Sequence, residues 1–188
     1  DDIKIKDVAY TGMVNDKTGY ILLTRFSRNS APEMQKALTK LKKEKAESII
    51  LDLRNNPGGL LQSSIDILDM LLPKNQLLLS TKGRTKGSNR TFYSKRDPII
   101  SEEVKLAVLI NGGSASASEI VSGTIQDLDR GVIIGKRSFG KGLVQSVYDL
   151  DDKNRLKMTT AKYYIPSGRL IQSSGYVEEN IIEFSMED

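Results

Sequence analysis

The sequence predicts an α/β fold in which a parallel-rich sheet with crossover helices is followed by C-terminal antiparallel β segments. Short runs rich in Ile, Leu and Val alternate with segments of helical periodicity, which is the pattern of strand–helix–strand crossover units. Beyond residue 143 the chain changes to β-rich segments that are typical of antiparallel strands. With 188 residues, of which 38% are hydrophobic, the chain has the size of one globular domain.

The first part of the chain contains a strand–helix–strand unit. The apolar runs at residues 19–24 and 48–53 are short and bounded by turn or polar residues, as buried strands are. Between them, residues 30–33 (Ser-Ala-Pro-Glu) form a capping-box pattern with proline in the first turn, so a helix is predicted to begin there. Its apolar face is supplied by Met34, Ala37, Leu38 and Leu41.

A second helix and a basic segment follow. The helix is predicted over about residues 60–72, where Pro73 ends it. Residues 82–96 combine glycine with basic and aromatic side chains and are predicted to form a hairpin or an exposed loop. Binding of single-stranded nucleic acid is the alternative for such a segment, but no repeat or stripe supports it. No nucleic-acid partner is expected.

The alternation of strand and helix then resumes. Strands are predicted at residues 106–110 and 132–134, with a helix over about residues 116–128 between them. Antiparallel strands are predicted at residues 143–150 and 156–165. Three glycine-containing turns therefore follow predicted strands, and open α/β sheets bind their ligands at such strand ends.

The composition limits the possible chemistry. The chain contains no cysteine and no histidine, which excludes disulfides, thiolate nucleophiles, histidine-containing catalytic triads and His-ligated metal sites. A general base must therefore be a carboxylate, an amine or a tyrosine. The net charge of +4 arises from 28 basic and 24 acidic residues, a balance that says little about partners.

The chain shows no targeting or membrane segment. No apolar run approaches the length needed to span a bilayer, and the first residues have neither an initiator Met nor the apolar core of a signal peptide. We expect a mature fragment or an excised domain.

The first of the three turns covers residues 52–60 and contains Pro57, Gly58 and Gly59 ahead of a predicted helix. Backbone N–H groups at a helix start beside two glycines are unhindered, and they suit a phosphate or a developing oxyanion. Glycines required only for their backbone angles are the alternative.

The second turn covers residues 111–120 and contains three serines at a spacing of two. Ser114 and Ser118 are expected to share one side of a helix and Ser116 to point away from them, so only one serine is expected to be special. The alternative is structural, because Ser116 to Glu119 is itself a capping-box pattern and small serines pack well where a helix crosses a sheet.

The third turn covers residues 135–145. Its spacing of glycine, four residues, glycine and lysine matches a phosphate-binding loop. Gly142 stands where that motif needs a Ser or Thr hydroxyl, and a strand is predicted where the motif needs a helix. A nucleotide-binding domain is therefore the weaker interpretation.

Lys141 is the candidate for the general base that the missing histidine leaves open. An ammonium group removed from water loses its proton more easily, so a buried lysine can act as a base at neutral pH. Gln145, four residues further on, is expected on the same face and could orient the amine by hydrogen bonding. A surface lysine in a glycine-rich turn is the alternative.

Four blocks in this order resemble the catalytic core of the carboxyl-terminal processing peptidases, or tail-specific proteases, of serine peptidase family S41. They are residues 51–59, 114–120, 139–145 and 166–172, and the resemblance extends over about residues 19–172. It implies a ClpP/crotonase-like core. We expect one domain over residues 1–188, with 1–18 as a lead-in and 173–188 as a C-terminal extension.

The resemblance implies Ser116 as the nucleophile, Lys141 as the general base and Gln145 as the supporting amide. It implies an oxyanion hole formed by the N–H of Ala117 and by the Pro-Gly-Gly turn, with Gly58 as first choice and Gly59 as second. The implied reaction is acyl transfer, in which a protein is cut near its C-terminus through an acyl-enzyme. No metal or organic cofactor is required.

Family members usually carry a PDZ domain ahead of the core that captures the substrate's C-terminal tail. The residues before Gly19 are too few to form one, so the chain is expected to be a core without its PDZ domain, and the lead-in could be a remnant of that junction. The resemblance implies substrates with apolar C-terminal tails and a bacterial periplasm or cell envelope. Residues 173–188 are expected to dock as a strand or short helix, with a dimer contact as the alternative.

A second hypothesis is a binding module, because related cores occur in retinoid-binding proteins that use the fold without proteolysis. The presence of Ser116, Lys141 and Gln145 together argues against it, since a binding protein needs none of the three. Nucleotide binding by residues 135–141 is the third hypothesis.

Overall fold

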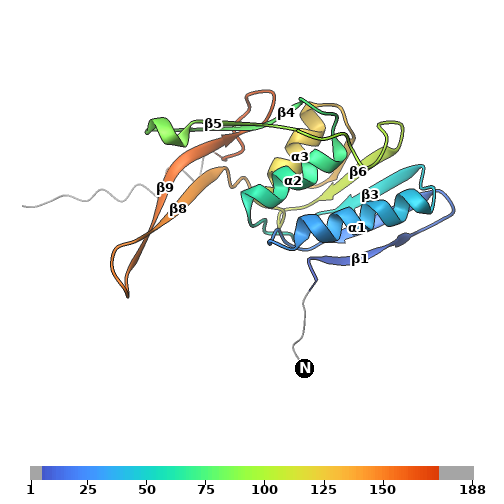
Figure 1. Cartoon of the computed structure of the whole chain (residues 1–188), viewed down its shortest axis with the longest axis horizontal. Coiled ribbons are helices and arrows are strands. Elements are labelled where there is room, and N and C mark those ends of the chain that lie inside the picture. The colour runs from blue at the N-terminus through green and yellow to red at the C-terminus, as the bar shows by residue number, and fades with distance from the viewer. Residues whose placement is uncertain (1–5, 174–188) are drawn as a thin grey trace, which may run out of the picture.

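The computed structural model describes residues 6–173, which form two sheets and three α-helices (Figure 1). In chain order the elements are β1 Val8–Met13, β2 Thr18–Leu23, α1 Ser30–Lys43, β3 Ser48–Asp52, α2 Leu61–Leu71, β4 Leu77–Gly83, the 3-10 turn η1 Lys86–Ser88, β5 Arg90–Tyr93, β6 Lys105–Ile110, α3 Ala117–Asp127, β7 Val132–Gly135, β8 Leu143–Asp149 and β9 Arg155–Tyr164. The predicted α/β fold class is confirmed. The expected docking of the C-terminal extension lies outside the described residues, apart from Ser173.

The larger sheet has the strand order β1-β2-β3-β6-β7. Strands β2, β3, β6 and β7 pair in parallel, which confirms the predicted crossover units. The antiparallel edge strand β1 was not predicted, and it lies in the segment that we had expected to be a lead-in. Its sequence, Val-Ala-Tyr-Thr-Gly-Met, has no clear apolar alternation, and a bulge after Val8 interrupts its register.

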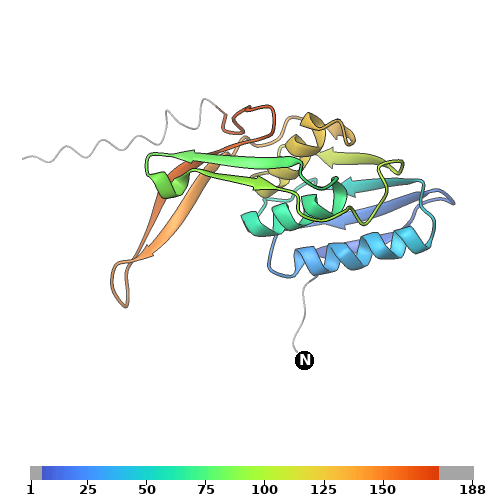
Figure 2. The same cartoon turned by 45° about the horizontal axis from the view of Figure 1, so that its top comes forward.

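All three α-helices cover the same face of this sheet (Figures 1 and 2). Successive parallel strands are added in one direction, and right-handed crossovers in one direction place every connecting helix on one side. The fully buried side chains that fill the space between helices and sheet include Ile21, Leu23, Met34, Leu38, Ile49, Leu51, Ile67, Leu68, Val108, Val121 and Ile125. This single core fixes the carboxyl ends of β3, β6 and β7 next to one another.

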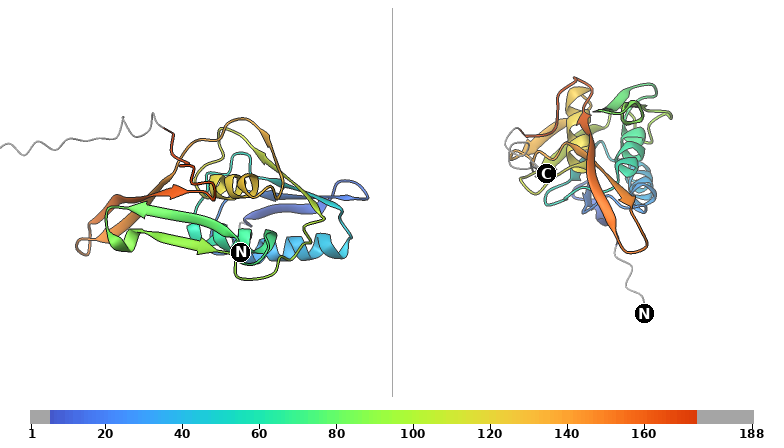
Figure 3. Two further views of the ribbon diagram at one scale, coloured as in Figure 1. Left: turned by 90° about the horizontal axis from the view of Figure 1, so that it is seen from above. Right: turned by 90° about the vertical axis from the view of Figure 1, so that its left-hand side faces the viewer.

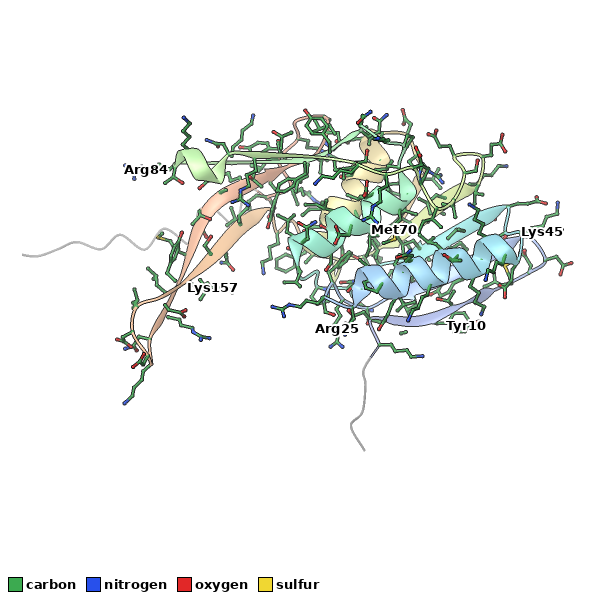
Figure 4. The ribbon with its side chains drawn as sticks, in the orientation of Figure 1. Tyr10, Arg25, Lys45, Met70, Arg84 and Lys157 are labelled. Carbon is green, nitrogen blue, oxygen red and sulfur yellow. The ribbon has the colours of Figure 1, made fainter. Side chains whose placement is uncertain are left out.

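The second sheet is antiparallel, with the strand order β5-β4-β9-β8. The β4–β5 pair confirms the hairpin predicted for the basic segment, and β8 and β9 confirm the predicted C-terminal strands. The β8–β9 hairpin projects from the core as an arm (Figure 3), and Lys157 on β9 lies along this arm (Figure 4). β8 begins two residues after Lys141, so the arm starts at the candidate site.

The predicted capping box at the start of α1 is wrong, although the helix begins at Ser30 as predicted. The carboxylate of Glu33 instead accepts hydrogen bonds from the backbone N–H groups of Asp7 and Val8, each at 2.8 Å. The hydroxyl of Ser30 donates to the Asp7 carboxylate at 2.6 Å. The two side chains therefore hold the start of β1 against α1, a long-range use that the local pattern does not reveal.

Asp7 is a buried carboxylate with 1% of its surface exposed. It accepts hydrogen bonds from Arg25 Nε at 2.5 Å, from Ser30 and from Ser27. Burial alone would raise the pKa of Asp7, but the hydrogen bonds from Arg25, Ser27 and Ser30 outweigh burial and lower the pKa. A lowered pKa in the folded state means that Asp7 stabilises the fold above the pKa of the unfolded chain.

We expect Asp7→Asn to lower the free energy of unfolding by about 1–3 kcal/mol at pH 7, because one ionised acceptor of several hydrogen bonds is lost. The difference from the wild type should shrink as the pH falls below about 4, where the wild-type carboxyl is protonated in the unfolded chain and then in the folded one. Urea unfolding followed from pH 7 to pH 2 measures it, with the exposed Asp16→Asn as control. A difference that does not change with pH would contradict the assignment.

Candidate active site

Ser114 and Ser118 join the first two turns. Ser114 Oγ donates to the backbone oxygen of Leu53 at 2.8 Å, and Ser118 Oγ donates to that of Asn56 at 2.9 Å. Both serines are buried. They point to the same side, as predicted, and their hydroxyls have structural roles.

Ser116 is different from its two neighbours. It is half-exposed and lies directly before the first residue of α3, with φ 54° and ψ −113°. A positive φ is strained for a residue with a side chain and costs on the order of 1–3 kcal/mol, which the surrounding contacts must offset. A serine on a strained turn between a strand and a helix has the geometry of a nucleophile elbow.

Gly58 packs directly against the Ser116 turn. It has φ 90°, and a Cβ atom added to it would lie 2.5 Å from Ala115 O, 2.8 Å from Ala117 N and 2.9 Å from Ser116 Cβ. Such distances exclude any side chain, so here glycine is required by both its backbone angle and the close approach of the two turns.

The N–H of Gly58 already has a partner, because it donates to Asn56 Oδ1 at 2.9 Å. Asn56 is fully buried and anchored in turn by a 2.8 Å hydrogen bond from its Nδ2 to Leu23 O. Within residues 6–173, the N–H groups of Gly59 and Ala117 have no hydrogen-bond acceptor. The N–H of Gly58, our first choice, is therefore already paired, whereas those of Gly59, our second choice, and Ala117 are available to a bound acceptor.

Glu119 connects the second turn to the third. One of its carboxylate oxygens, Oε2, accepts hydrogen bonds from Ser116 N and from Lys141 N, each at 2.8 Å. The other oxygen, Oε1, accepts one from Gly140 N at 2.6 Å. Glu119 is only 5% exposed, so these three N–H groups replace the water that a carboxylate needs.

Lys141 lies in the lysine loop, which we define as residues 138–142. Its side chain is half-buried, whereas Gln145 on β8 is exposed. Within the described residues, no hydrogen bond joins Lys141 Nζ to Ser116 or to Gln145. The structure therefore places Lys141 near Ser116 through their shared partner Glu119 and leaves Gln145 unconnected to either.

A strand follows Lys141, since β8 begins at Leu143. A phosphate-binding loop requires a helix at this point. The strand at this position argues against nucleotide binding, as the strand predicted from the sequence does.

A polar triad fixes the beginning of the first turn. Tyr20 Oη and Arg54 Nη2 each donate to Asp52 Oδ2 at 2.6 Å. Burial would raise the pKa of Asp52, but the hydrogen bonds from Arg54 and Tyr20 outweigh burial and lower the pKa. Burial and the hydrogen bond to Asp52 raise the pKa of Tyr20. The triad ties β2 to β3 at the end from which the glycine turn begins.

Three residues with roles in the site's geometry were not predicted as such. The predicted capping box of Ser116 and Glu119 is confirmed, but the hydrogen bonds of Glu119 to the lysine loop were not predicted. Asn56 was not singled out, and Gln172 was noted only as part of the fourth block. Gln172 Oε1 accepts a 2.9 Å hydrogen bond from Gly142 N. The signal for Asn56 is local, because an Asn two residues before Gly58 suits an Asx turn.

A cavity of about 320 Å³ lies between α3 and the lysine loop. Glu119, Gly140 and Gln172 border it, together with apolar walls from Ile110 and Ile165. Within residues 6–173, no group of three or more acidic side chains is placed to hold a metal ion.

Comparisons with known proteins identify the family of this chain. Residues 17–182 match the model of peptidase family S41. The carboxy-terminal-processing protease of Bartonella bacilliformis is 42% identical over 187 residues, which cover 97% of this chain and 42% of that protein. The carboxyl-terminal-processing protease of Synechocystis sp. is 39% identical over 165 residues, which cover 88% of this chain and 38% of that protein. The photosystem II D1 C-terminal processing protease has a similar structure, with a TM-score of 0.79 and 33% identity, over 90% of this chain and 46% of that one.

The fold and the site define an α/β core with a serine on a strained strand–turn–helix junction. The chain belongs to peptidase family S41, the serine peptidase family that contains the carboxyl-terminal processing proteases. The resemblance found from the four blocks is confirmed. The chain spans about two fifths of the length of the curated relatives described above. No helix between residues 6 and 173 is long and apolar enough to cross a membrane.

We expect Gly58→Ala to abolish peptide hydrolysis, because the added methyl group would push the Ser116 turn away from the first turn. The matched control is Gly112→Ala in the second turn, where an added Cβ would meet nothing within 4 Å. Steady-state hydrolysis and circular dichroism of both variants measure the effect. Hydrolysis by a folded Gly58→Ala variant at the wild-type rate would contradict the close approach.

Proposed function

We propose that this chain is the catalytic core of a serine endopeptidase that cuts proteins near their C-termini with a Ser116/Lys141 dyad. The observation that carries the proposal is the shared Glu119 oxygen, which holds the backbone N–H groups of Ser116 and Lys141 at 2.8 Å each. No histidine is available to act as the base. Family membership supports the reaction class.

In the proposed reaction, Lys141 acts as a free amine and takes the proton of Ser116 Oγ, which attacks the scissile carbonyl carbon. The N–H groups of Ala117 and Gly59 donate to the oxyanion that forms. When the intermediate collapses, the C–N bond breaks and the Lys141 ammonium gives its proton to the leaving amine. Water then attacks the ester with Lys141 again as base, which releases the acid product and restores Ser116.

Gln145 remains a proposed supporting residue on the strength of the resemblance alone, because its side chain on β8 is exposed and makes no hydrogen bond to Lys141 within the described residues. No metal or organic cofactor takes part in this scheme. The steps use only the hydroxyl, the amine, two backbone N–H groups and water.

The substrate is proposed to be an extended protein segment with apolar residues. A groove of about 320 Å³ is lined by residues of β4, β5, β8 and β9, and Leu61, two residues after Gly59, also lines it. Phe92, Val144 and Tyr148 contribute apolar surface to it, and Thr81 and Ser146 contribute polar groups. The lining is of mixed polarity, since Thr85, Ser88, Arg90 and Thr160 also contribute to it. The preference for apolar residues therefore rests on the family resemblance.

The broader biological setting also remains proposed. Capture of the substrate tail by a PDZ domain and a position in the bacterial periplasm or envelope are predictions from the resemblance. A dimer contact through residues 173–188 is the alternative to their docking on the core. The single-domain organisation over residues 1–188 is likewise a prediction. These predictions concern the whole protein, and the geometry of residues 6–173 does not test them.

We expect the wild-type chain to hydrolyse an unstructured protein with an apolar C-terminus, and Ser116→Ala and Lys141→Ala each to lower kcat by at least about a thousandfold. The control Lys136→Ala changes an exposed lysine near the same loop and should leave the rate within about twofold of the wild type. The rates are measured by mass spectrometry of the products. Near-normal hydrolysis by a folded Ser116→Ala or Lys141→Ala variant would refute the dyad.

A further inference from the structure

The block at residues 166–172 has no role in the reaction proposed above. It follows β9 and reverses the chain direction at Gly168, which has φ 81°. The returning segment pairs with the end of β9 through a bridge between Leu170 and Tyr164. Ser167 N donates to Asp127 Oδ2 at 2.9 Å and so ties the reversal to the last residue of α3. The block therefore carries residues 171–173 back to the lysine loop.

At the lysine loop, this returning segment makes two hydrogen bonds. Gly142 N donates to Gln172 Oε1 at 2.9 Å, and Ser173 N donates to Gly140 O at 3.0 Å. Gln172 is 7% exposed. Because Glu119 accepts from Gly140 N and Lys141 N, three consecutive backbone N–H groups of the loop donate to two buried side chains.

The returning segment also packs closely against the glycines of the lysine loop. A Cβ atom added to Gly142 would lie 2.3 Å from Gln172 N, and one added to Gly140 would lie 2.8 Å from Ser173 Cβ. The cavity of about 320 Å³ between α3 and the lysine loop is bordered by Gly140, Glu119 and Gln172. Side chains therefore do not pack against the loop on every side. The position of Lys141 therefore depends on hydrogen bonds from both flanks.

We propose that Gln172 is a positioning residue for catalysis, which together with Glu119 fixes the backbone of Lys141 so that the amine is presented to Ser116. This inference rests on the proposed function. It assigns the fourth block a purpose, since the reversal at Gly168 and the anchor at Asp127 serve to deliver one amide oxygen to Gly142. A misplacement of about 1 Å in a reacting group can lower a rate by about a hundredfold.

The test compares Gln172→Met with the wild-type chain. Methionine has a similar length and shape but offers no comparable acceptor, so the Gly142 N–H loses its partner. The matched control is Gln62→Met on α2, where the exposed glutamine donates only to Asp66. We measure kcat and KM for hydrolysis, the midpoint of thermal unfolding, and amide hydrogen exchange of Gly142 by NMR.

We expect Gln172→Met to lower kcat by about ten- to a hundredfold with KM within about twofold, and to speed exchange of the Gly142 amide by at least about tenfold. Gln62→Met should change none of these. Unchanged kcat in Gln172→Met, or unchanged exchange at Gly142, overturns the positioning role. An inactive wild type rejects the proposed function instead, whereas an active wild type with an equally active Gln172→Met rejects this inference alone.

Discussion

The buried carboxylate of Glu119 is the group on which the arrangement of the site depends. A carboxylate that is 5% exposed is costly unless hydrogen bonds replace its water, and here the donors are the backbone N–H groups of Ser116, Gly140 and Lys141. These donors belong to two turns that follow different strands. The hydrogen bonds to this one side chain therefore require the Ser116 turn and the lysine loop to stay together, and they help to offset the strained backbone of Ser116.

The sheet makes this arrangement possible. Strands β3, β6 and β7 are parallel neighbours, so the turns at their carboxyl ends meet at one edge. Gly58 lets the first turn approach the second without a side chain between them. Asn56 anchors the first turn, because its side chain hydrogen-bonds to Gly58 N and to Leu23 O. The proposed reaction depends on this convergence, because it needs a nucleophile, a base and two N–H donors within reach of one carbonyl.

Much of the fold could be predicted from local patterns, because buried strands and amphipathic helices leave periodic apolar residues. Strand β1 could not, since its sequence does not alternate and a bulge breaks its register. The candidate nucleophile and lysine follow from their motifs, but the partners of Glu33 and Gln172, and the partners of Glu119 in the lysine loop, lie 21 to 30 residues away in the sequence. A capping box is a pattern between near neighbours, so it assigned Glu33 to the wrong partner. No local pattern points from Gln172 to Gly142, so Gln172 was left without a role.

The most direct measurement is the rate at which a fluorophosphonate, which modifies activated serines, labels the wild-type chain and Glu119→Gln, with the labelled residue identified by peptide mass mapping. A glutamine at this position keeps the shape but loses one carboxylate oxygen, so at least one of the three N–H donors loses its acceptor. The account predicts label on Ser116 alone in the wild type and a rate at least about tenfold lower in folded Glu119→Gln. Label on Ser114 or Ser118, or equal rates in the two proteins, would contradict it.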